Sequence, residues 1–351
     1  MFICGFCLGV TDLTERLAAY VAHRLPAARD VRVDGLERIH GGASRETYRF
    51  RLRYCADGDE LERHLILRRD PPGSLIETER ANEFNAYRAF HGTVVPVPEP
   101  IWLEENSSWL DYPFFVMQEL RGFQAQAQAL QMSPYSEHLE ALAERKWSIL
   151  GEISKADPEQ LGLTELMPRP ALDECWRREL AHWEKVIDED EMNPQPIIRA
   201  AIRWLRRNPP PPAQKLAVVH GDFRTGNFLY DGAGEIHAIL DWEMAHLGDP
   251  LEDLAWGINR VWCWARDERV GGLVDKARAI AIWEKASGLR ADAAGLHWWE
   301  LFSSVKGQAI WISSGKEYQH GKNQEPVLAL SGWWLMNAQD RAVLETMGFL
   351  R

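Results

Sequence analysis

Hydrophobic and polar residues alternate in the first third of the chain, and this pattern predicts β-strands flanked by helices. Strands are expected within three segments, 31–53, 61–69 and 109–120. Helical spacing of apolar residues predicts helices over 13–25 and over about 76–90. The pattern therefore indicates a small β-rich region in the N-terminal part of the chain.

Downstream of this region the apolar residues recur mainly at helical spacing. Amphipathic stretches predict helices within 123–207 and 251–345, and no internal repeat is visible. We therefore predict an α+β fold with a β-rich N-terminal lobe, residues 1–122, and a larger, mainly helical C-terminal lobe, residues 123–351. Residues 1–12 are expected to form a flexible tail.

A short polar segment late in the chain carries the candidate chemistry. Asp222 and Asn227 stand five residues apart, and Asp241 follows fourteen residues after Asn227. The turn residues at 230–235 separate two apolar runs. This order predicts a loop, a short strand, a hairpin turn and a second strand that ends near Asp241.

Phosphoryl transfer of the kinase type needs these residue types in this arrangement. One Asp accepts the proton of the attacking hydroxyl, while an Asn and a second Asp hold the Mg²⁺ ions that bridge the nucleotide phosphates. Asp222 is therefore the candidate catalytic base, and Asn227 and Asp241 are the candidate metal ligands. Each residue alone could be an ordinary turn or cap residue, but their joint spacing favours the catalytic interpretation.

The segment HGDFRTGNFL, followed by LDWEMAHLGDPLEDLAW, resembles the aminoglycoside phosphotransferase/choline kinase-like family. It is most similar to the branch that contains kinase-like domains associated with acyl-CoA dehydrogenases, and the resemblance covers about residues 38–256. These proteins are small-molecule kinases with a two-lobed protein-kinase-like fold. The resemblance implies an ATP-dependent, Mg²⁺-dependent phosphotransferase that acts on a hydroxyl group of a small molecule, with GTP as an alternative nucleotide.

The resemblance also assigns residues to the nucleotide site. A glycine-rich turn allows close approach of backbone N–H groups to phosphate oxygens, and here it would present Gly42, Ser44 and Arg45. Taken alone, two adjacent glycines in a hairpin usually mark only a turn. The segment 115–120 resembles the hinge that binds the adenine edge, which would involve Gln118, Glu119 and Leu120.

The chain departs from the family pattern at the cation that orients the nucleotide phosphates. Kinases place a lysine there, paired with a helix carboxylate, but no lysine precedes Lys146 in this sequence. Arg68 occupies the matching position, and Glu83 is its expected partner. Strand alternation directs Arg69 to the opposite face. Without the family register, Arg68 and Glu83 would be read as solvent-exposed charges.

Several residues around the polar segment have weaker assignments. His220 is expected to orient the loop by hydrogen bonding, and Arg224 to pair with an acid of the loop. Glu243 either contacts metal or substrate, or caps the following helix. Asp249 and Asp253 are expected to be structural, because acids favour the first turn of a helix.

Composition and charge limit the classes of partner. A net charge of −12 argues against nucleic acid as a partner, and no apolar run approaches the ~18 residues expected of a membrane helix. The N-terminus lacks the basic start of a signal peptide. Cys4 and Cys7 are interpreted as reduced thiols rather than half of a zinc site, and the other cysteines are scattered. These features predict a cytoplasmic protein.

The acceptor is the least determined part of the reaction. Tryptophans are frequent between 256 and 334, and we favour core packing over an aromatic substrate wall for each of them. Aminoglycoside enzymes tend to carry a dense acidic acceptor pocket near the C-terminus, but residues 336–351 offer only Asp340 and Glu345. This difference weakens the expectation of an antibiotic substrate.

Three functional hypotheses remain. The leading one is phosphorylation of a small hydroxylated metabolite. The second, from the branch resemblance, is a kinase for a hydroxyacyl-CoA or a hydroxy acid. The third is a nucleotide-binding module without catalysis, which only the missing lysine favours. The sequence does not predict an oligomeric state.

Overall fold

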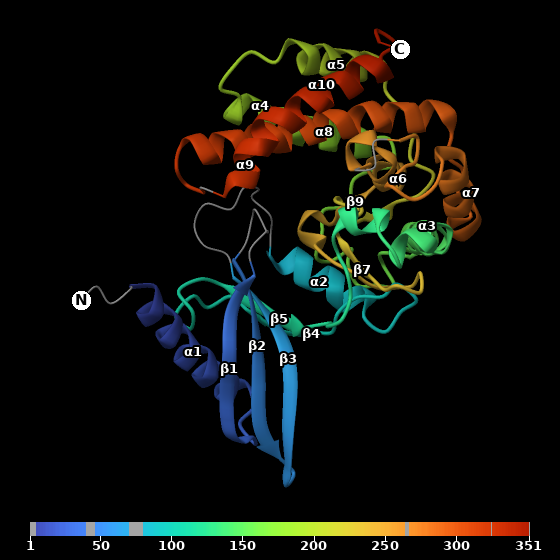
Figure 1. The fold of residues 1–351 in the computed structure, drawn as a ribbon. Helices are drawn as coiled ribbons and strands as arrows, with labels where there is room; N and C mark the ends of the chain where they lie inside the picture. Colours follow the sequence, from blue (N-terminus) through green and yellow to red (C-terminus); the bar gives the residue numbers. More distant parts are fainter. Residues whose placement is uncertain (1–4, 40–45, 70–79, 264–266, 324, 351) are drawn as a thin grey trace. The chain divides into compact units, whose positions relative to one another are not determined.

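The computed structural model describes residues 5–39, 46–69, 80–263, 267–323 and 325–350 (Figure 1). The chain divides into two compact units. Residues 1–84 and 98–121 form the first unit, and residues 85–97 and 122–351 form the second. The predicted boundary after residue 122 lies next to this division, but the segment 85–97, which was expected in the first lobe, groups with the second unit.

An antiparallel five-stranded sheet forms the first unit, in the order β1-β2-β3-β5-β4. Its strands are β1 Arg29–Ile39, β2 Glu46–Ala56, β3 Asp59–Arg69, β4 Pro100–Glu104 and β5 Phe114–Gln118. The hairpin between β2 and β3 turns at Asp57 and Gly58, both with positive φ, as a two-residue Asp-Gly turn requires.

Helix α1, Gly5–Arg24, packs against this sheet (Figure 1). Leu13, Leu17, Tyr20 and Val21 are buried at helical spacing and join the sheet residues in one core cluster. The expectation of a flexible tail over residues 1–12 is wrong for residues 5–12, which are helical. Once the packed part of a helix has formed, each further turn costs little. Residues 1–4, including Cys4, lie outside the described residues.

The sequence pattern missed strand β4 and overestimated the strand expected within 109–120. Strand β4 begins at Pro100 and lies at the edge of the sheet, where a strand tolerates proline because one side needs no backbone donor. Only Phe114–Gln118 of the expected segment is a strand, since Asp111 adopts a left-handed backbone before it. Helix α2 is described from Arg80 to Phe90, so the start expected near residue 76 lies outside the described residues.

The second unit is mainly helical, as the sequence predicts, and contains two small antiparallel sheets. Its helices are α3 Leu139–Lys155, α4 Cys175–Asp190, α5 Pro196–Arg207, α6 Leu251–Ile258, α7 Lys276–Ser287, α8 Ala293–Gln319, α9 Pro326–Leu330 and α10 Met336–Thr346. One sheet pairs β6 Ala217–Val219 with β9 His246–Gly248, and the other pairs β7 Phe228–Tyr230 with β8 Ile236–Ile239.

Helix α8 is the central element of this unit and contacts α4, α5, α6 and α10 (Figure 1). Trp298, Trp299 and Trp311 of this helix are buried, as expected for core residues. Near the C-terminus, in contrast, Trp333 is 72% exposed. Within the described residues no helix, α8 included, is long and apolar enough to cross a membrane.

Helices α3 and α7 pack closely at Gly151, and a substitution there should destabilise the second unit. A Cβ at position 151 would lie 2.5 Å from the Cβ of Ala286 and 2.9 Å from the backbone nitrogen of Ser287. We expect Gly151→Ala to lower the free energy of unfolding by about 1–3 kcal/mol, because the helices must separate. Urea unfolding measures this loss, with Ser148→Ala on the same helix as a control that should change stability by less than about 0.5 kcal/mol. Equal stability of both variants would contradict the close packing.

Candidate active site

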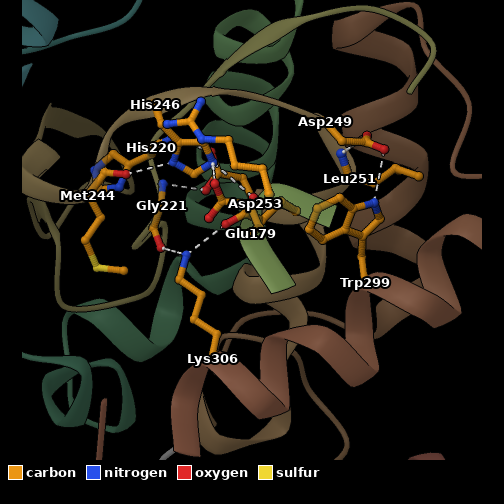
Figure 2. Close-up of polar contacts among 12 residues, drawn as sticks. Glu179, His220, Gly221, Met244, His246, Asp249, Leu251, Asp253, Trp299 and Lys306 are labelled. Atoms are coloured by element: carbon orange, nitrogen blue, oxygen red, sulfur yellow. Dashed lines mark hydrogen bonds and ion pairs between the residues drawn. The ribbon is translucent and has the colours of Figure 1, made fainter. Parts of the chain in front are cut away.

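The loop that follows β6 is held through its backbone N–H groups, which bond to a buried carboxylate of α6. The N–H groups of His220 and Gly221 donate to the carboxylate of Asp253, at 2.6 and 2.9 Å. Gly221 has a φ of +85°, and a Cβ there would lie 2.5 Å from the carbonyl oxygen of Met244. Asp253 is buried in the first turn of α6, and burial raises its pKa. The structural role expected for Asp253 is therefore observed as direct support of the loop (Figure 2).

His220 joins the loop to the end of β8. Its Nε2 donates to the carbonyl oxygen of Leu240 at 2.9 Å, and its Nδ1 accepts from the backbone N–H of Asp222 at 3.1 Å. This pair of bonds requires the neutral imidazole, and burial lowers the His220 pKa. His220 thus orients the loop by hydrogen bonding, as the sequence predicts.

Three donors hold the carboxylate of Asp222. The indole N–H of Trp256 donates to Oδ1 at 2.7 Å, the amide nitrogen of Asn227 donates to Oδ2 at 2.6 Å, and Nε of Arg224 lies 3.1 Å from both oxygens. The side chain of Asp222 remains 15% exposed. The carboxylate is therefore fixed in direction and still partly accessible. Arg224 pairs with an acid of the loop, as expected, whereas the contact of Trp256 was not predicted.

The two candidate metal ligands meet across the hairpin formed by β7 and β8. The backbone N–H of Leu240, which precedes Asp241, donates to the carbonyl oxygen of Asn227 at 2.8 Å. The side-chain nitrogen of Asn227 is used by Asp222, so its Oδ1 is the atom suited to a cation. The structure therefore brings Asp222, Asn227 and Asp241 into one small region.

Asp241 has an unusual backbone conformation. Its φ and ψ of 67° and 55° lie in the left-handed region, which Asp tolerates better than most residues. Its backbone N–H donates to the hydroxyl of Tyr87 at 2.8 Å. Within the described residues its side chain makes no capping hydrogen bond to the following 3₁₀ turn, Trp242–Met244, which contains Glu243. Asp241 thus stands at the N-cap position of this turn but does not cap it with its side chain.

A cluster of buried charged side chains lies next to the loop (Figure 2). Nε2 of His246 lies 3.1 Å from Glu252 and 3.6 Å from Glu179, and Nζ of Lys306 lies 2.9 Å from the second oxygen of Glu252. Ligand atoms of Glu179, His246 and Glu252 lie within 4.8 Å of one another, a spacing that would admit a metal ion. The cations of Lys306 and His246 already balance the two glutamates, so we interpret the cluster as an ion-pair network.

The same surroundings shift the titration of these groups. Burial alone would lower the His246 pKa, but Glu179 and Glu252 outweigh burial and raise it to about 9. Asp249 is a second buried acid, and burial raises its pKa to about 6, while it accepts hydrogen bonds from the backbone of Leu251 and the indole of Trp299. Asp249 therefore holds α6 against α8, in agreement with its expected structural role.

Lys146, the first lysine of the chain, lies buried on α3 next to the loop. Its Nζ is 3.2 Å from the hydroxyl of Thr225 and 4.5 Å from the ring centre of Trp147. Burial, with a smaller contribution from the nearby Arg224, lowers the Lys146 pKa to about 7. No local pattern predicts this lysine beside the loop, because it is 79 residues from Thr225 in the chain.

In the first unit, Arg68 of β3 forms a buried ion pair with Glu83 of α2. Arg68 is only 9% exposed and Glu83 is fully buried. Arg69 points away and pairs with Glu46 at 2.6 Å. The opposite orientation of the two arginines agrees with the expected strand alternation. Gly42, Ser44 and Arg45 lie outside the described residues.

The predicted hinge, residues 115–120, covers most of β5 and the two residues after it in the first unit. The backbone N–H of Gln118 donates to Glu99 and that of Glu119 donates to His64, both at 2.9 Å. No hydrogen bond to the backbone N–H of Leu120 occurs within the described residues. Among the three predicted hinge residues, Leu120 thus differs from Gln118 and Glu119, whose backbone N–H groups are bonded within the first unit.

A sequence model described as the phosphotransferase enzyme family matches residues 35–289. Acyl-CoA dehydrogenase family member 10 of Mus musculus is 31% identical over 218 residues, which is 61% of this chain but 19% of the mouse protein. The chain thus spans about a fifth of the length of that relative.

Solved structures with the same fold include phosphotransferases of aminoglycosides. A Ralstonia eutropha protein assigned by inference to that group superposes with a TM-score of 0.73 at 21% identity, covering 96% of this chain and 99% of the other. A thermostable variant of aminoglycoside phosphotransferase APH(4)-Ia, solved with ADP and hygromycin B, gives 0.58 at 16% identity, covering 94% and 98%. These similarities confirm the predicted kinase-like fold.

The raised pKa of His246 predicts a loss of stability at alkaline pH. A group with a pKa of about 9 when folded and 6.5 when unfolded stabilises the protein fully below pH 6.5, and this contribution is lost as the pH rises through 9. The expected loss is on the order of 3 kcal/mol. In Glu179→Gln the decline should be smaller and end at lower pH, because one of the two carboxylates that raise the folded-state pKa of His246 is gone.

Urea unfolding between pH 6 and pH 10 measures this effect. Glu189→Gln is the matched control, since Glu189 is an exposed glutamate of the same helix and should leave the profile unchanged. An identical profile in Glu179→Gln and in the unsubstituted protein would show that Glu179 does not set the titration of His246.

Proposed function

Because the chain belongs to the phosphotransferase enzyme family, we propose that it is an ATP-dependent, Mg²⁺-dependent kinase that phosphorylates a hydroxyl group of a small molecule. One observation carries this proposal. The partly exposed carboxylate of Asp222 is hydrogen-bonded to Asn227, and the backbone of Asn227 is bonded to the residue before Asp241. A base and two metal ligands that flank one hairpin are the parts that phosphoryl transfer requires.

Asp222 is the proposed catalytic base. The acceptor oxygen forms a bond to the terminal phosphorus of ATP, the bond from that phosphorus to the bridging oxygen of ADP breaks, and the hydroxyl proton passes to the carboxylate of Asp222. The donors from Trp256, Asn227 and Arg224 hold the carboxylate in one orientation while the acceptor approaches. A fixed base raises the rate because little reorganisation is needed in the transition state.

Asn227 and Asp241 are the proposed Mg²⁺ ligands. The amide oxygen of Asn227 and the carboxylate of Asp241 are hard oxygen donors, which suit this cation. The cation would neutralise charge on the nucleotide phosphates when bound. Glu243 follows Asp241 closely enough to contact metal or substrate, and we keep it as a secondary candidate.

The first unit supplies the proposed nucleotide contacts. Arg68, oriented by Glu83, would bind phosphate oxygens, since a guanidinium matches phosphate geometry with two parallel bonds. The backbone N–H of Leu120, which has no partner within the described residues, supports adenine binding at the hinge segment, together with Gln118 and Glu119. Gly42, Ser44 and Arg45 complete the proposed phosphate site. The ADP in a structure of the same fold supports a nucleotide ligand.

The acceptor has a main and an alternative interpretation. We propose a hydroxylated metabolite rather than a polycationic antibiotic, because the C-terminal acids are few and Glu345 already pairs with Arg341 at 2.8 Å. The alternative is a hydroxyacyl-CoA or hydroxy acid. It is favoured by the similarity to acyl-CoA dehydrogenase family member 10, in which the matched part is a minor portion of a longer protein.

The hypothesis of a non-catalytic module loses its main support. It depended on the missing lysine, but Arg68 is paired with the helix carboxylate as a phosphate cation of a kinase would be. We further propose a cytoplasmic location, which the free thiols of Cys55, Cys175 and Cys263 support. No nucleic acid or membrane partner is proposed.

Substitutions of Asp222 and Asp241 should separate catalysis from metal binding. We expect Asp222→Asn to lower turnover by roughly 100- to 10,000-fold, because an amide cannot accept the proton, while Mg²⁺ and ATP together still raise the melting temperature. Asp241→Asn should lose the Mg²⁺-dependent part of that rise. Asparagine is chosen at 241 because it tolerates the left-handed backbone. Thermal shift and phosphate release measure the two effects.

Asp231→Asn is the control for both variants, since Asp231 lies in the same hairpin and bonds only to the turn and His237. It should retain binding and turnover. Full turnover by Asp222→Asn on an identified acceptor would refute the assignment of the base.

A panel of acceptors with ATP should identify the substrate class. We expect mass spectra to show phosphorylation of a small hydroxylated metabolite, and hygromycin B to remain unmodified. Phosphorylation of 4-hydroxyacyl-CoA or of a hydroxy acid would favour the alternative class of acceptor. A free hydroxy acid and its CoA ester form a matched pair that tests whether the thioester is recognised. Efficient phosphorylation of hygromycin B would contradict the proposed acceptor class.

A further inference from the structure

Lys306 of α8 reaches the catalytic loop from a part of the chain that carries no motif. Its side chain is 1% exposed, and its Nζ donates to the carbonyl oxygen of Gly221 at 2.6 Å and to Glu252 at 2.9 Å (Figure 2). Gly221 directly precedes Asp222. The ammonium group therefore holds the backbone at the residue that sets the direction of the proposed base.

A second path leads from Lys306 to the carboxylate itself. Nζ lies 5.1 Å from the ring centre of Trp256, within the range of a cation–π interaction. The indole N–H of the same ring donates to Oδ1 of Asp222 at 2.7 Å. A cation at the ring draws electron density from the indole, which makes its N–H a stronger donor to the carboxylate.

The charged groups around Lys306 keep it protonated. Glu252 is in direct contact, while Glu179 and Asp253 contribute further negative charge. Burial alone would lower the Lys306 pKa, but these carboxylates raise it. His246 balances the remaining charge of the two glutamates. The ammonium is thus a permanent cation beneath the loop.

Stability by itself does not require this arrangement. Buried ion pairs can often be replaced by apolar residues of similar volume without loss of stability, because removing two charges from water is costly. A lysine that also donates to a loop carbonyl fixes the position of the backbone, and an apolar side chain cannot do this.

We propose that Lys306 is a positioning residue for phosphoryl transfer, which fixes Asp222 through the carbonyl of Gly221 and the indole of Trp256. This inference rests on the proposed function, because Asp222 must act as the base. It assigns a role in the reaction to α8 and predicts that the charge on Lys306 controls turnover more than nucleotide binding.

The test removes the positive charge of Lys306 together with the negative charge of its partner Glu252, so that no buried carboxylate loses its counter-ion. Lys306→Met combined with Glu252→Gln keeps the volumes and the net charge of the site. We expect kcat to fall by roughly 10- to 100-fold, because a small displacement of the base is costly, while KM for ATP and the melting temperature change little. The reaction is release of phosphate from ATP with Mg²⁺ and water as the acceptor.

The matched control removes another ion pair of the same helix. Lys316 pairs with Asp190 at 2.7 Å, and neither residue contacts the loop. Lys316→Met with Asp190→Asn should leave kcat unchanged. A folded Lys306 variant that turns over at the rate of the unsubstituted protein would overturn the inference.

The path through Trp256 has its own spectroscopic test, which needs no turnover. In protein with ¹⁵N-labelled tryptophan, the indole N–H signal of Trp256, assigned by its absence in Trp256→Phe, should move upfield in the Lys306 variant because its hydrogen bond weakens. The signal should stay in place in the Lys316 control. An unmoved signal in the Lys306 variant would overturn the proposed path through the indole.

Trp256→Phe also covers the case in which the Lys306 variant does not fold. This variant keeps every charge and an aromatic ring, but it removes the N–H donor together with part of the ring volume. It should therefore lower kcat while ATP binding is retained. Wild-type turnover by folded Trp256→Phe overturns the inference. Absence of Mg²⁺- and ATP-dependent binding in the unsubstituted protein would instead refute the proposed function, so the two failures are distinguishable.

Discussion

The carboxylate of Asp253 accepts both backbone N–H groups at the start of the loop that carries Asp222, those of His220 and Gly221. Strand β6 ends at Val219, and Gly221 has a positive φ, so these two N–H groups have no partner in a β-sheet. An unpaired buried N–H costs free energy comparable to a lost hydrogen bond. The buried carboxylate removes that cost, and the direction of Asp222 depends on the backbone that it holds.

A buried carboxylate at this place creates a second requirement, which is compensation of charge. Glu252 is the neighbour of Asp253 on α6, and Glu179 of α4 lies near it, so three acids share a small volume. The cations of Lys306 and His246 make this possible. The network therefore connects α4, α6, α8 and β9 to the loop, and it explains why the helices of the second unit matter for a site formed by a hairpin.

In the first unit, the residue expected to orient the nucleotide phosphates is Arg68 rather than a lysine. An arginine stands where kinases of this type carry a lysine, and the planar guanidinium is larger and offers more donors than an ammonium group. Burial of Arg68 against the fully buried Glu83 fixes the orientation of that group. The same strand places Arg69 on the opposite face, where Glu46 neutralises it.

The sequence by itself determined the α+β fold, most strands and helices, and the group formed by Asp222, Asn227 and Asp241. It could do so because these residues stand on the two segments that enter and leave one hairpin, in which turn length and strand register set the distances between neighbours. The edge strand β4 was missed because Pro100 and the prolines just before it, Pro96 and Pro98, suppress the strand signal. Only the tertiary structure decided which distant residues hold the loop. Lys306 is 85 residues from Gly221, and Trp256 is 34 residues from Asp222. A lysine or tryptophan on a helix has the same local pattern whether it packs in a core or positions a catalytic group, so packing of the helices decided those roles.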